Sequence, residues 1–564
     1  MKKTPLILAL SAVMATGAIV PAFAEEGNQN PGPSIEQREG KAGFQKAHPV
    51  FSWDNPGPLS PVLHKGSIRG AGMVEKPLNE IDSYMDQMIS EGAMPGAVAF
   101  VARRGHIVKH DAYGYAYKYE DDQFTESENP IPMREDTIFD LASISKIFTT
   151  TAAMILYEQG RFGLDDPVAK YLPEFAANGK ENVTIRQLMT HTSGFAAWIP
   201  LYTQGTNRED RIDIVLKYPL SNQPGTKYTY SDLNMITLGV LIERLSGERQ
   251  DEFVRNYITE PLGMKDTMYN PPASLKSRVA ATEFQPWTGR GIVWGDVHDE
   301  NAWALGGIAG HAGVFSTAGD LAKLAHMYLN DGRYGSEQIL KPETVKMLIE
   351  NQIPEFPGND HGLGWELAQG WFMDALSEGS TLGHTGYTGT SIVVNRNNGT
   401  IAILLTNRVH PTRNTVTTNI ARRQLARQVA DAIPVRIPDG KAWFSGYGDK
   451  LNRSLLAEVE LAEPAKLSFE TWYRIEASAD YGYLEWSVDG LNWERAKTFT
   501  SSSVDWVSEE AEIPAGAKFI RFTYTTDSSV NGRGWYVDKL KLVSKDGKPI
   551  ELNFDGDGWK QRSY

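Results

Sequence analysis

The chain has no cysteine among its 564 residues. This absence excludes disulfide bonds, zinc sites with thiolate ligands and catalysis by a cysteine nucleophile. Basic residues are fewer than acidic ones, with 56 Lys and Arg against 70 Asp and Glu, and they form no block. The resulting net charge of -14 argues against a nucleic-acid-binding role, because clustered positive charge is needed to bind the phosphate backbone.

Long apolar runs are missing after the first residues of the chain. There, Lys2 and Lys3 precede an apolar stretch that closes on an Ala-Phe-Ala tripeptide, which is typical of a secretory signal peptide. The stretch is short for a membrane span, so a membrane anchor is the weaker alternative. We expect residues 1–24 to be a signal peptide. The mature chain is then expected in the cell wall or exterior of a bacterium, without a transmembrane anchor.

Apolar periodicity begins only near residue 76. Residues 25–75 are rich in Gly, Pro, Asn and Ser, and we expect them to form a flexible leader. Over 76–433 the patterns predict one domain, with helices at 76–91 and 413–432 and strands at 97–103, 106–115, 391–395 and 400–406. The stretch 136–366 is mostly helical and loop-rich. We therefore expect a sheet built from both ends of the domain, with an α-helical lobe inserted.

Helical signals are missing after residue 433. A linker at 434–445 leads into short alternating runs with turns between them, at 466–472, 483–488, 518–524 and 535–542. This spacing predicts a separate β-sandwich over 446–564. Its acidic stretch at 553–557 is either a solvated turn or a calcium loop. Its aromatic residues either pack the core or stack on sugars and peptides.

Ser143 and Lys146 stand at the head of a largely apolar stretch, 139–156. Polar groups in a buried helix are costly unless they are paired or used. A helix that begins near Ser143 places both side chains on one face, with the serine at the positive end of the helix dipole. We expect the apolar surroundings to lower the pKa of Lys146, so that it accepts the serine proton. The alternative is a chance match, with the serine as a helix cap.

Two further motifs follow in order, Tyr230-Ser231-Asp232 before an amphipathic helix and His384-Thr385-Gly386 before a strand. With phrases such as LASISK, LMTHTSGF and GLDDPVAKYLPEF, the sequence resembles the serine hydrolases of the class C β-lactamase and penicillin-binding protein group over roughly 76–432. It is most similar to the penicillin-binding-protein-4B type. The C-terminal phrases GYLEWSVDGLNWE and GWYVDKLKLV more weakly resemble jelly-roll accessory domains of secreted peptidases.

The resemblance implies a β-lactamase/transpeptidase-like α/β (α+β) fold, with an antiparallel sheet flanked by helices. It also implies an acyl-enzyme on Ser143, with Lys146 and Tyr230 exchanging the proton in an order that stays open. The backbone N–H groups of Ser143 and Tyr387 are the implied oxyanion hole. Substrate binding is assigned to Asp232, His384, Thr385, Gly386 and Tyr387. This chain has Asp232 where many members have Asn, and His384 where many have Lys.

The implied activity is that of a D-alanyl-D-alanine carboxypeptidase or a related hydrolase of peptidoglycan peptides. A muramyl-peptide amidase, a carboxylesterase and a non-catalytic wall-binding module are the alternatives. The expected substrate is a peptidoglycan-derived peptide or ester, the group also admits β-lactams as covalent ligands, and the C-terminal domain offers a cell-wall contact. No metal ion or cofactor is expected.

Several histidines outside these motifs have competing interpretations. A metal site at His298-Asp299-Glu300 lacks a second nearby histidine, so loop hydrogen bonding is the favoured interpretation. His191 is expected to be a structural loop residue. For His311, between glycines, the alternatives are packing in a tight turn and a place in the cleft.

Overall fold

A central, mainly antiparallel sheet joins the two ends of the predicted hydrolase domain. The computed structural model describes residue 53 and residues 57–564. The strand order is β1-β3-β2-β13-β12-β11-β10, with β4 paired to β3, and β2 pairs with β13 so that Val101 faces Ala402. This pairing confirms the sheet predicted from distant hairpins. The strands are β1 His64–Lys65, β2 Gly96–Arg103, β3 His106–Tyr119, β4 Glu126–Pro132, β10 Glu366–Leu367, β11 Thr381–Gly386, β12 Thr390–Asn395 and β13 Thr400–Thr406.

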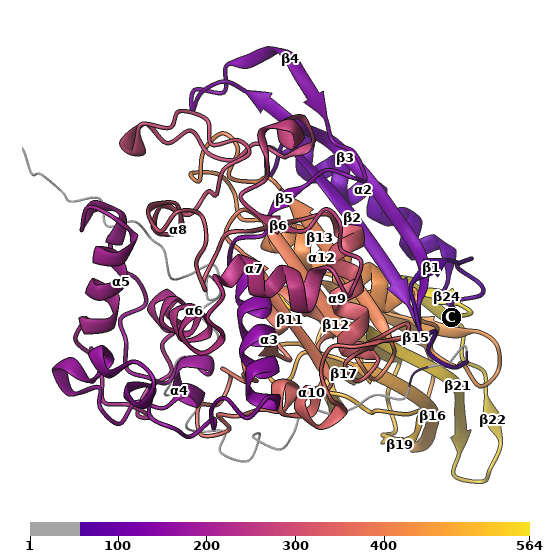
Figure 1. Ribbon diagram of the computed structural model, residues 1–564. Coiled ribbons are helices and arrows are strands. Elements are labelled where there is room, and N and C mark those ends of the chain that lie inside the picture. The colour runs from indigo at the N-terminus through magenta and orange to yellow at the C-terminus, as the bar shows by residue number, and fades with distance from the viewer. Residues whose placement is uncertain (1–52, 54–56) are drawn as a thin grey trace, which may run out of the picture.

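Helices cover both faces of this sheet (Figure 1). On one face, α2 (Glu75–Ser90) and α12 (Asn419–Asp431) close a core with the strands. On the other face, α3 (Ser145–Glu158) and α9 (Ala318–Leu329) pack into the largest core. Because the central strands are buried on both sides, they are almost continuously apolar and do not alternate.

The helical lobe lies beyond α3, which separates it from the sheet in Figure 1. The apolar residues of α3 occur all round the helix because every side chain from Ser145 to Leu156 is buried. The helices between the two hairpins confirm the predicted inserted lobe. Its helices include α4 Ile185–Met189, α5 Arg208–Lys217, α6 Asp232–Ser246, α7 Gln250–Val254 and α8 Glu300–Ala304, and α10 Pro342–Ile349 and α11 Gly370–Met373 follow towards the sheet.

The last helix of the domain begins later than the sequence predicts. The predicted range is 413–432, whereas α12 begins at Asn419. Arg413 lies in the preceding loop, where its guanidinium forms ion pairs of 2.6 Å with Glu283 and with Glu300. Paired charges from distant loops therefore outweigh the local helical propensity of this segment.

The segment before α2 is packed against the sheet from residue 57 on. Strand β1 pairs in parallel with β3, and Ala71 is fully buried. The guanidinium of Arg103 donates hydrogen bonds to the carbonyls of Ala71 and Gly72. The part of the expected leader that the structure describes is thus an ordered segment packed against the sheet. The expected signal peptide lies outside the described residues. None of the described helices has the length and apolar character to cross a membrane.

The C-terminal region is all-β and consists of two main sheets. Their orders are β19-β16-β21-β14-β24 and β18-β17-β20-β15-β23, with β22 paired to β21. Trp535 and Trp559 lie in the core between them, which favours the core-packing interpretation for these two aromatic residues. The strands are β14 Ala442–Phe444, β15 Asn452–Glu458, β16 Ala465–Arg474, β17 Tyr481–Ser487, β18 Glu494–Phe499, β19 Val507–Ile513, β20 Phe519–Thr525, β21 Gly534–Ser544, β22 Pro549–Ile550, β23 Phe554–Asp557 and β24 Lys560–Arg562.

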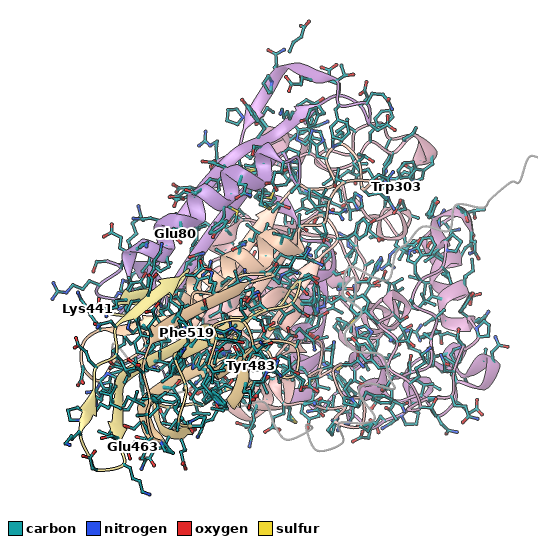
Figure 2. The ribbon with its side chains drawn as sticks, turned by 180° about the vertical axis from the view of Figure 1, so that it is seen from behind. Glu80, Trp303, Lys441, Glu463, Tyr483 and Phe519 are labelled. Carbon is teal, nitrogen blue, oxygen red and sulfur yellow. The ribbon has the colours of Figure 1, made fainter. Side chains whose placement is uncertain are left out.

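The sandwich contacts the hydrolase domain through buried charges. Figure 2 shows it from behind, marked by Lys441, Tyr483 and Phe519, on the side of the molecule where Glu80 marks α2. Arg562 of β24 forms a 2.6 Å ion pair with Asp431 at the end of α12. Strand β14 lies inside the expected linker, 434–445, and pairs with β21 and β24.

Candidate active site

Ser143 lies in a 3-10 turn, Ala142–Ile144, directly before α3. Ala142 has a φ of 48°, a left-handed conformation that costs energy for a residue with a Cβ. The turn is held by Asp140, whose carboxylate accepts hydrogen bonds from the amides of Ala142, at 2.8 Å, and His298, at 2.7 Å. The serine is therefore presented on a rigid, strained turn at the helix N-terminus.

Lys146 is fully buried one turn further along the chain. Its ammonium donates to Ser143 Oγ at 2.8 Å and to the carbonyl of His311 at 3.3 Å. It also forms a 2.9 Å ion pair with Asp232 and lies 4.7 Å from the centre of the Tyr230 ring. The two polar residues in the apolar stretch are thus paired with each other, as their spacing predicts.

The expected lowering of the Lys146 pKa is wrong. Burial alone would lower this pKa, but the negative charge of Asp232, together with interactions with Tyr230, outweighs burial and raises it above the usual value. Lys146 is therefore an ammonium group in the resting site. The aspartate is part of the second motif, but the sequence does not show that its carboxylate contacts the lysine.

Tyr230 lies in the turn directly before α6 and its ring contacts the Lys146 ammonium. Burial is the largest cause that raises its pKa, to about 12, with Asp232 adding and Lys146 opposing. The turn that carries it is fixed by His191, whose Nδ1 accepts a hydrogen bond of 3.1 Å from the amide of Ser231. His191 thus has the structural loop position that the sequence predicts.

The third motif lies on β11, beside the serine turn. A Cβ atom on Gly386 would lie 2.3 Å from the carbonyl oxygen of Leu141, so only glycine permits this approach. Thr388 Oγ1 donates to the carbonyl of Asp140 at 2.7 Å and ties the following turn to the same segment. Thr385 and Tyr387 both line the cleft. The backbone amide of Tyr387, which follows this contact, is therefore held close to the Ser143 turn.

One edge of β11 is open beside the cleft. On one side β11 pairs with β12 along its whole length. On the other side, among the described residues, only Leu382 and Gly383 pair with β10. The Thr385 end therefore has no strand partner on this side, which is the position that an extended ligand can take. The carbonyl of Thr385 already lies 2.8 Å from His384 Nδ1.

His384 is buried behind the surface of the cleft. It is 1% exposed and is not among the lining residues, and its ring centre lies 6.1 Å from that of Tyr230. Burial, with the nearby Lys146 charge, lowers its pKa to about 3, so the imidazole is neutral at pH 7. Its expected role in substrate binding stays a prediction.

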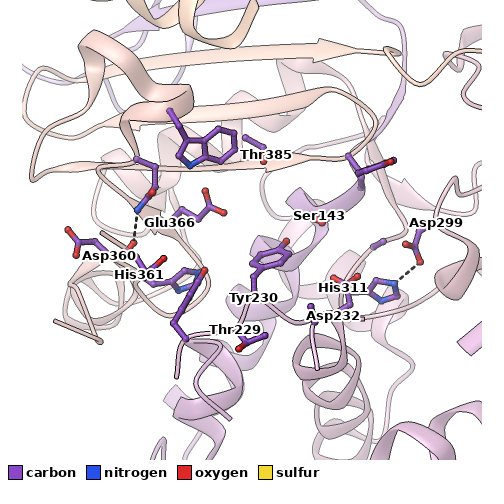
Figure 3. Close-up of a pocket in the computed structure, with 18 of the residues that line it drawn as sticks. Ser143, Thr229, Tyr230, Asp232, Asp299, His311, Asp360, His361, Glu366 and Thr385 are labelled. Carbon is purple, nitrogen blue, oxygen red and sulfur yellow. Dashed lines mark hydrogen bonds and ion pairs between the residues drawn. The ribbon is translucent and has the colours of Figure 1, made fainter. Parts of the chain in front are cut away.

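His311 and Asp299 lie on the side of the cleft opposite Glu366 of β10 (Figure 3). His311 Nε2 lies 2.7 Å from Asp299 Oδ1, and both residues line the cleft. Burial would raise the pKa of Asp299, but His311 and the amide of Ala302 hold it well below the usual range. His311 therefore belongs to the cleft, one of the two alternatives that the sequence left open.

The favoured interpretation of His298 and Glu300 agrees with their contacts. His298 Nε2 lies 2.9 Å from Glu283, and Glu300 pairs with Arg413. A different group, Asp232, Asp299 and His311, has ligand atoms within 4.8 Å of one another. The ammonium of Lys146 already pairs with this Asp232.

The cleft has a volume of about 500 Å³ and an acidic lining. Among the described residues that line it, Lys227 is the single lysine and there is no arginine, whereas five are carboxylates: Asp232, Asp299, Glu300, Asp360 and Glu366. The first three have cationic or histidine partners. Glu366 has an unpartnered Oε2, and burial raises its pKa to about 7. No motif marks Glu366, so the sequence gives no sign of its place in the cleft.

Comparisons with known proteins agree with this geometry. The family model described as Beta-lactamase matches residues 81–427, more than half of the chain. A protein of Escherichia coli (strain K12) named "Putative D-alanyl-D-alanine carboxypeptidase" is 33% identical over an alignment of 383 residues that covers 62% of this chain and 86% of that protein. A protein of Salmonella agona with the same name is also 33% identical, over 62% of this chain and 87% of its own length.

Solved structures share the fold of the hydrolase domain. A class C beta-lactamase has a TM-score of 0.51 at 18% identity, over 64% of this chain and 97% of that chain. A penicillin-binding protein homolog from Caulobacter crescentus has a TM-score of 0.50 at 20% identity, over 63% and 97% of the two chains. With the family match over residues 81–427, these findings show that the chain belongs to the beta-lactamase family of serine hydrolases.

Proposed function

We propose that this protein is an exported serine D-alanyl-D-alanine carboxypeptidase that acts on peptidoglycan peptides. The observation that carries the proposal is the contact of Ser143 Oγ with the Lys146 ammonium, with Tyr230 beside both. The relatives at 33% identity carry the name of this activity. The open edge of β11 suits a peptide that adds as a short strand and brings its scissile carbonyl to the serine.

In the proposed mechanism the proton acceptor is Tyr230. Asp232 stabilises the ammonium form of Lys146. The resting site becomes active when it loses one proton, and this proton therefore comes from the Tyr230 hydroxyl. The phenolate beside the ammonium takes the proton of Ser143 as Oγ attacks the carbonyl carbon. The amides of Ser143 and Tyr387 hold the developing oxyanion. The proton then passes from Tyr230 to the leaving amine, and water repeats the sequence on the acyl-enzyme.

A second candidate is hydrolysis of esters or amides that carry no free carboxylate. The acidic lining favours it, because Lys227 is the single lysine, and no arginine is found, among the described lining residues. A carboxylate next to Asp299 or Glu366 would be repelled.

The experiment compares an acyl-D-Ala-D-Ala peptide with the same peptide as its C-terminal methyl ester. The first proposal predicts release of D-alanine from the free acid with a kcat/KM at least equal to that for hydrolysis of the D-Ala–D-Ala bond in the ester. Cleavage of that bond in the ester alone would reject it and support the second candidate. The Ser143→Ala variant, matched in fold, corrects both rates for uncatalysed hydrolysis.

A further inference from the structure

A second group of acids lies far from the cleft, on two loops of the β-sandwich. Glu476 and Asp480 belong to the loop between β16 and β17, and Asp527 belongs to the loop between β20 and β21. Each offers one carboxylate oxygen, and these oxygens lie within 4.8 Å of one another. Like charges at this separation repel unless a cation or protons compensate them.

The buried Asp480 and the half-buried Glu476 each have a buried oxygen without a hydrogen-bond partner. Asp480 is 0% exposed, and its Oδ1 accepts a 2.8 Å hydrogen bond from the amide of Asp527. Its Oδ2 has no hydrogen-bond partner, and neither has Glu476 Oε2. A buried carboxylate oxygen without a partner is costly, so such a group points to a missing ligand.

The positive charge near this group is already used. Among the described residues, no lysine, arginine or histidine forms an ion pair with Glu476, Asp480 or Asp527. Arg423 is the cation whose charge acts on Glu476, and it pairs with Asp449 at 3.8 Å. Arg427 pairs with Asp374 at 2.7 Å and also with Asp449, at 3.1 Å.

Those two further acids add negative charge to the same region. Burial is the largest cause that raises the pKa of Glu476, to about 9, and of Asp480, to about 7, and neighbouring carboxylates add to both.

We propose that Glu476, Asp480 and Asp527 bind one calcium ion between the two loops. Calcium prefers carboxylate oxygens, with Ca–O distances of about 2.3–2.6 Å, so two of its ligands can lie up to about 5 Å apart. The three carboxylate oxygens lie within 4.8 Å of one another, which is compatible with this span. Magnesium, at about 2.0–2.1 Å, needs ligands that lie closer together and in stricter geometry.

The site has a consequence for the contact between the two domains. Asn531, in the same loop as Asp527, donates from its backbone amide to Asp374 at 3.3 Å and from its side chain to Asp449 at 2.7 Å. Asp374 belongs to the hydrolase domain. An ion that fixes this loop in the sandwich also fixes its contact with the hydrolase domain, so calcium stabilises the whole chain.

The acidic stretch at 553–557, which the sequence raised as a calcium loop, has a different structure. Phe554–Asp557 is strand β23, which pairs with β15. Asp557 is exposed, and this stretch contributes no residue to a cluster of potential ligands among the described residues. The Asp557→Asn variant therefore serves as a matched control of equal charge change in the same domain.

The test measures calcium binding by the full mature chain after removal of metals with a chelator. Calorimetric titration with CaCl2 should give one site, with a Kd of about 10⁻⁴–10⁻³ M or tighter, the range of extracellular calcium modules. CaCl2 at 10 mM should raise the unfolding midpoint by about 2 °C or more over NaCl of equal ionic strength. Absence of both effects, or equal binding of MgCl2, would overturn the proposal.

The variants locate the ion. Asp527→Asn removes an exposed ligand and should weaken calcium binding at least tenfold, and Asp480→Asn should do the same if it folds. Asp557→Asn should bind as the wild type does. Unchanged binding in Asp527→Asn, or loss of binding in Asp557→Asn, would place the ion elsewhere and reject this site.

Discussion

Asp232 changes the proton balance of the site at the scale of a single residue. It raises the pKa of Lys146 and adds to the raised pKa of Tyr230. Asp232→Asn removes this charge, so both pKa values fall and a larger fraction of the pair has lost one proton at neutral pH. We expect the rising limb of the pH profile of kcat/KM to move to lower pH by about one unit or more.

Buffers that span pH 6 to 10 and one neutral ester suffice for this measurement. A limb that stays in place, or one that moves to higher pH, would remove Asp232 from control of the proton relay. Asp320→Asn is a control, because Asp320 is a buried carboxylate of α9 that does not line the cleft.

Replacing Glu366 by Gln should raise the stability of the protein and lower its substrate selectivity. Its raised folded pKa of about 7 means that the folded state binds its proton more tightly than the unfolded state does. The glutamate therefore favours folding less as the pH rises from about 4.5 to 7, and ionised Glu366 destabilises the protein above that range. Glu366→Gln should raise the unfolding free energy at pH 8 by about 1–3 kcal/mol, and by much less at pH 4.

The same variant should lose selectivity for substrates with an amine near the scissile bond. Denaturant unfolding at pH 4 and pH 8 checks the stability, and paired amine and neutral esters check the selectivity. An equal change in stability at both pH values would show that Glu366 is not ionised in the folded protein at pH 8.

At the scale of elements, the contact between β11 and the serine turn decides whether the oxyanion hole forms. Gly386→Ala places a Cβ 2.3 Å from Leu141 O and must separate the two segments. We expect kcat to fall by about 10²–10³, the loss seen when one oxyanion donor is removed. Gly319→Ala, in α9, is the control, because its Cβ would meet only ordinary contact at 3.7 Å.

Circular dichroism must show that the Gly386→Ala variant is folded. If folded Gly386→Ala retains kcat within a factor of about three, the close approach of β11 has no catalytic role.

The sequence predicts most elements and the residues of the three motifs, because periodicity and short spacing are local properties. The sheet pairing of β2 with β13 also follows, since two hairpins in one domain need partners. The pKa of Lys146 could not be predicted, because its direction depends on where the carboxylate of Asp232 lies. The late start of α12 and the place of Glu366 depend in the same way on contacts between distant segments.

For the whole molecule, the buried charges between sandwich and hydrolase domain predict coupled stability. Arg562 and Asp431 are both largely buried and form a 2.6 Å ion pair. Arg562→Met leaves a buried carboxylate without its cation, which should cost about 3–5 kcal/mol. The temperature at which esterase activity is lost should fall together with the unfolding temperature of the sandwich. Loss of the sandwich alone, with activity kept to the wild-type temperature, would show independent domains.

The central claim is that Ser143 is acylated. The most direct measurement is intact mass spectrometry after a brief reaction with a slowly hydrolysed acyl donor, such as a penicillin, followed by peptide mapping. The account predicts one adduct per chain on the peptide that contains Ser143, and none in Ser143→Ala with an unchanged unfolding temperature. An adduct of equal yield in Ser143→Ala, or on another residue of the wild type, would contradict it.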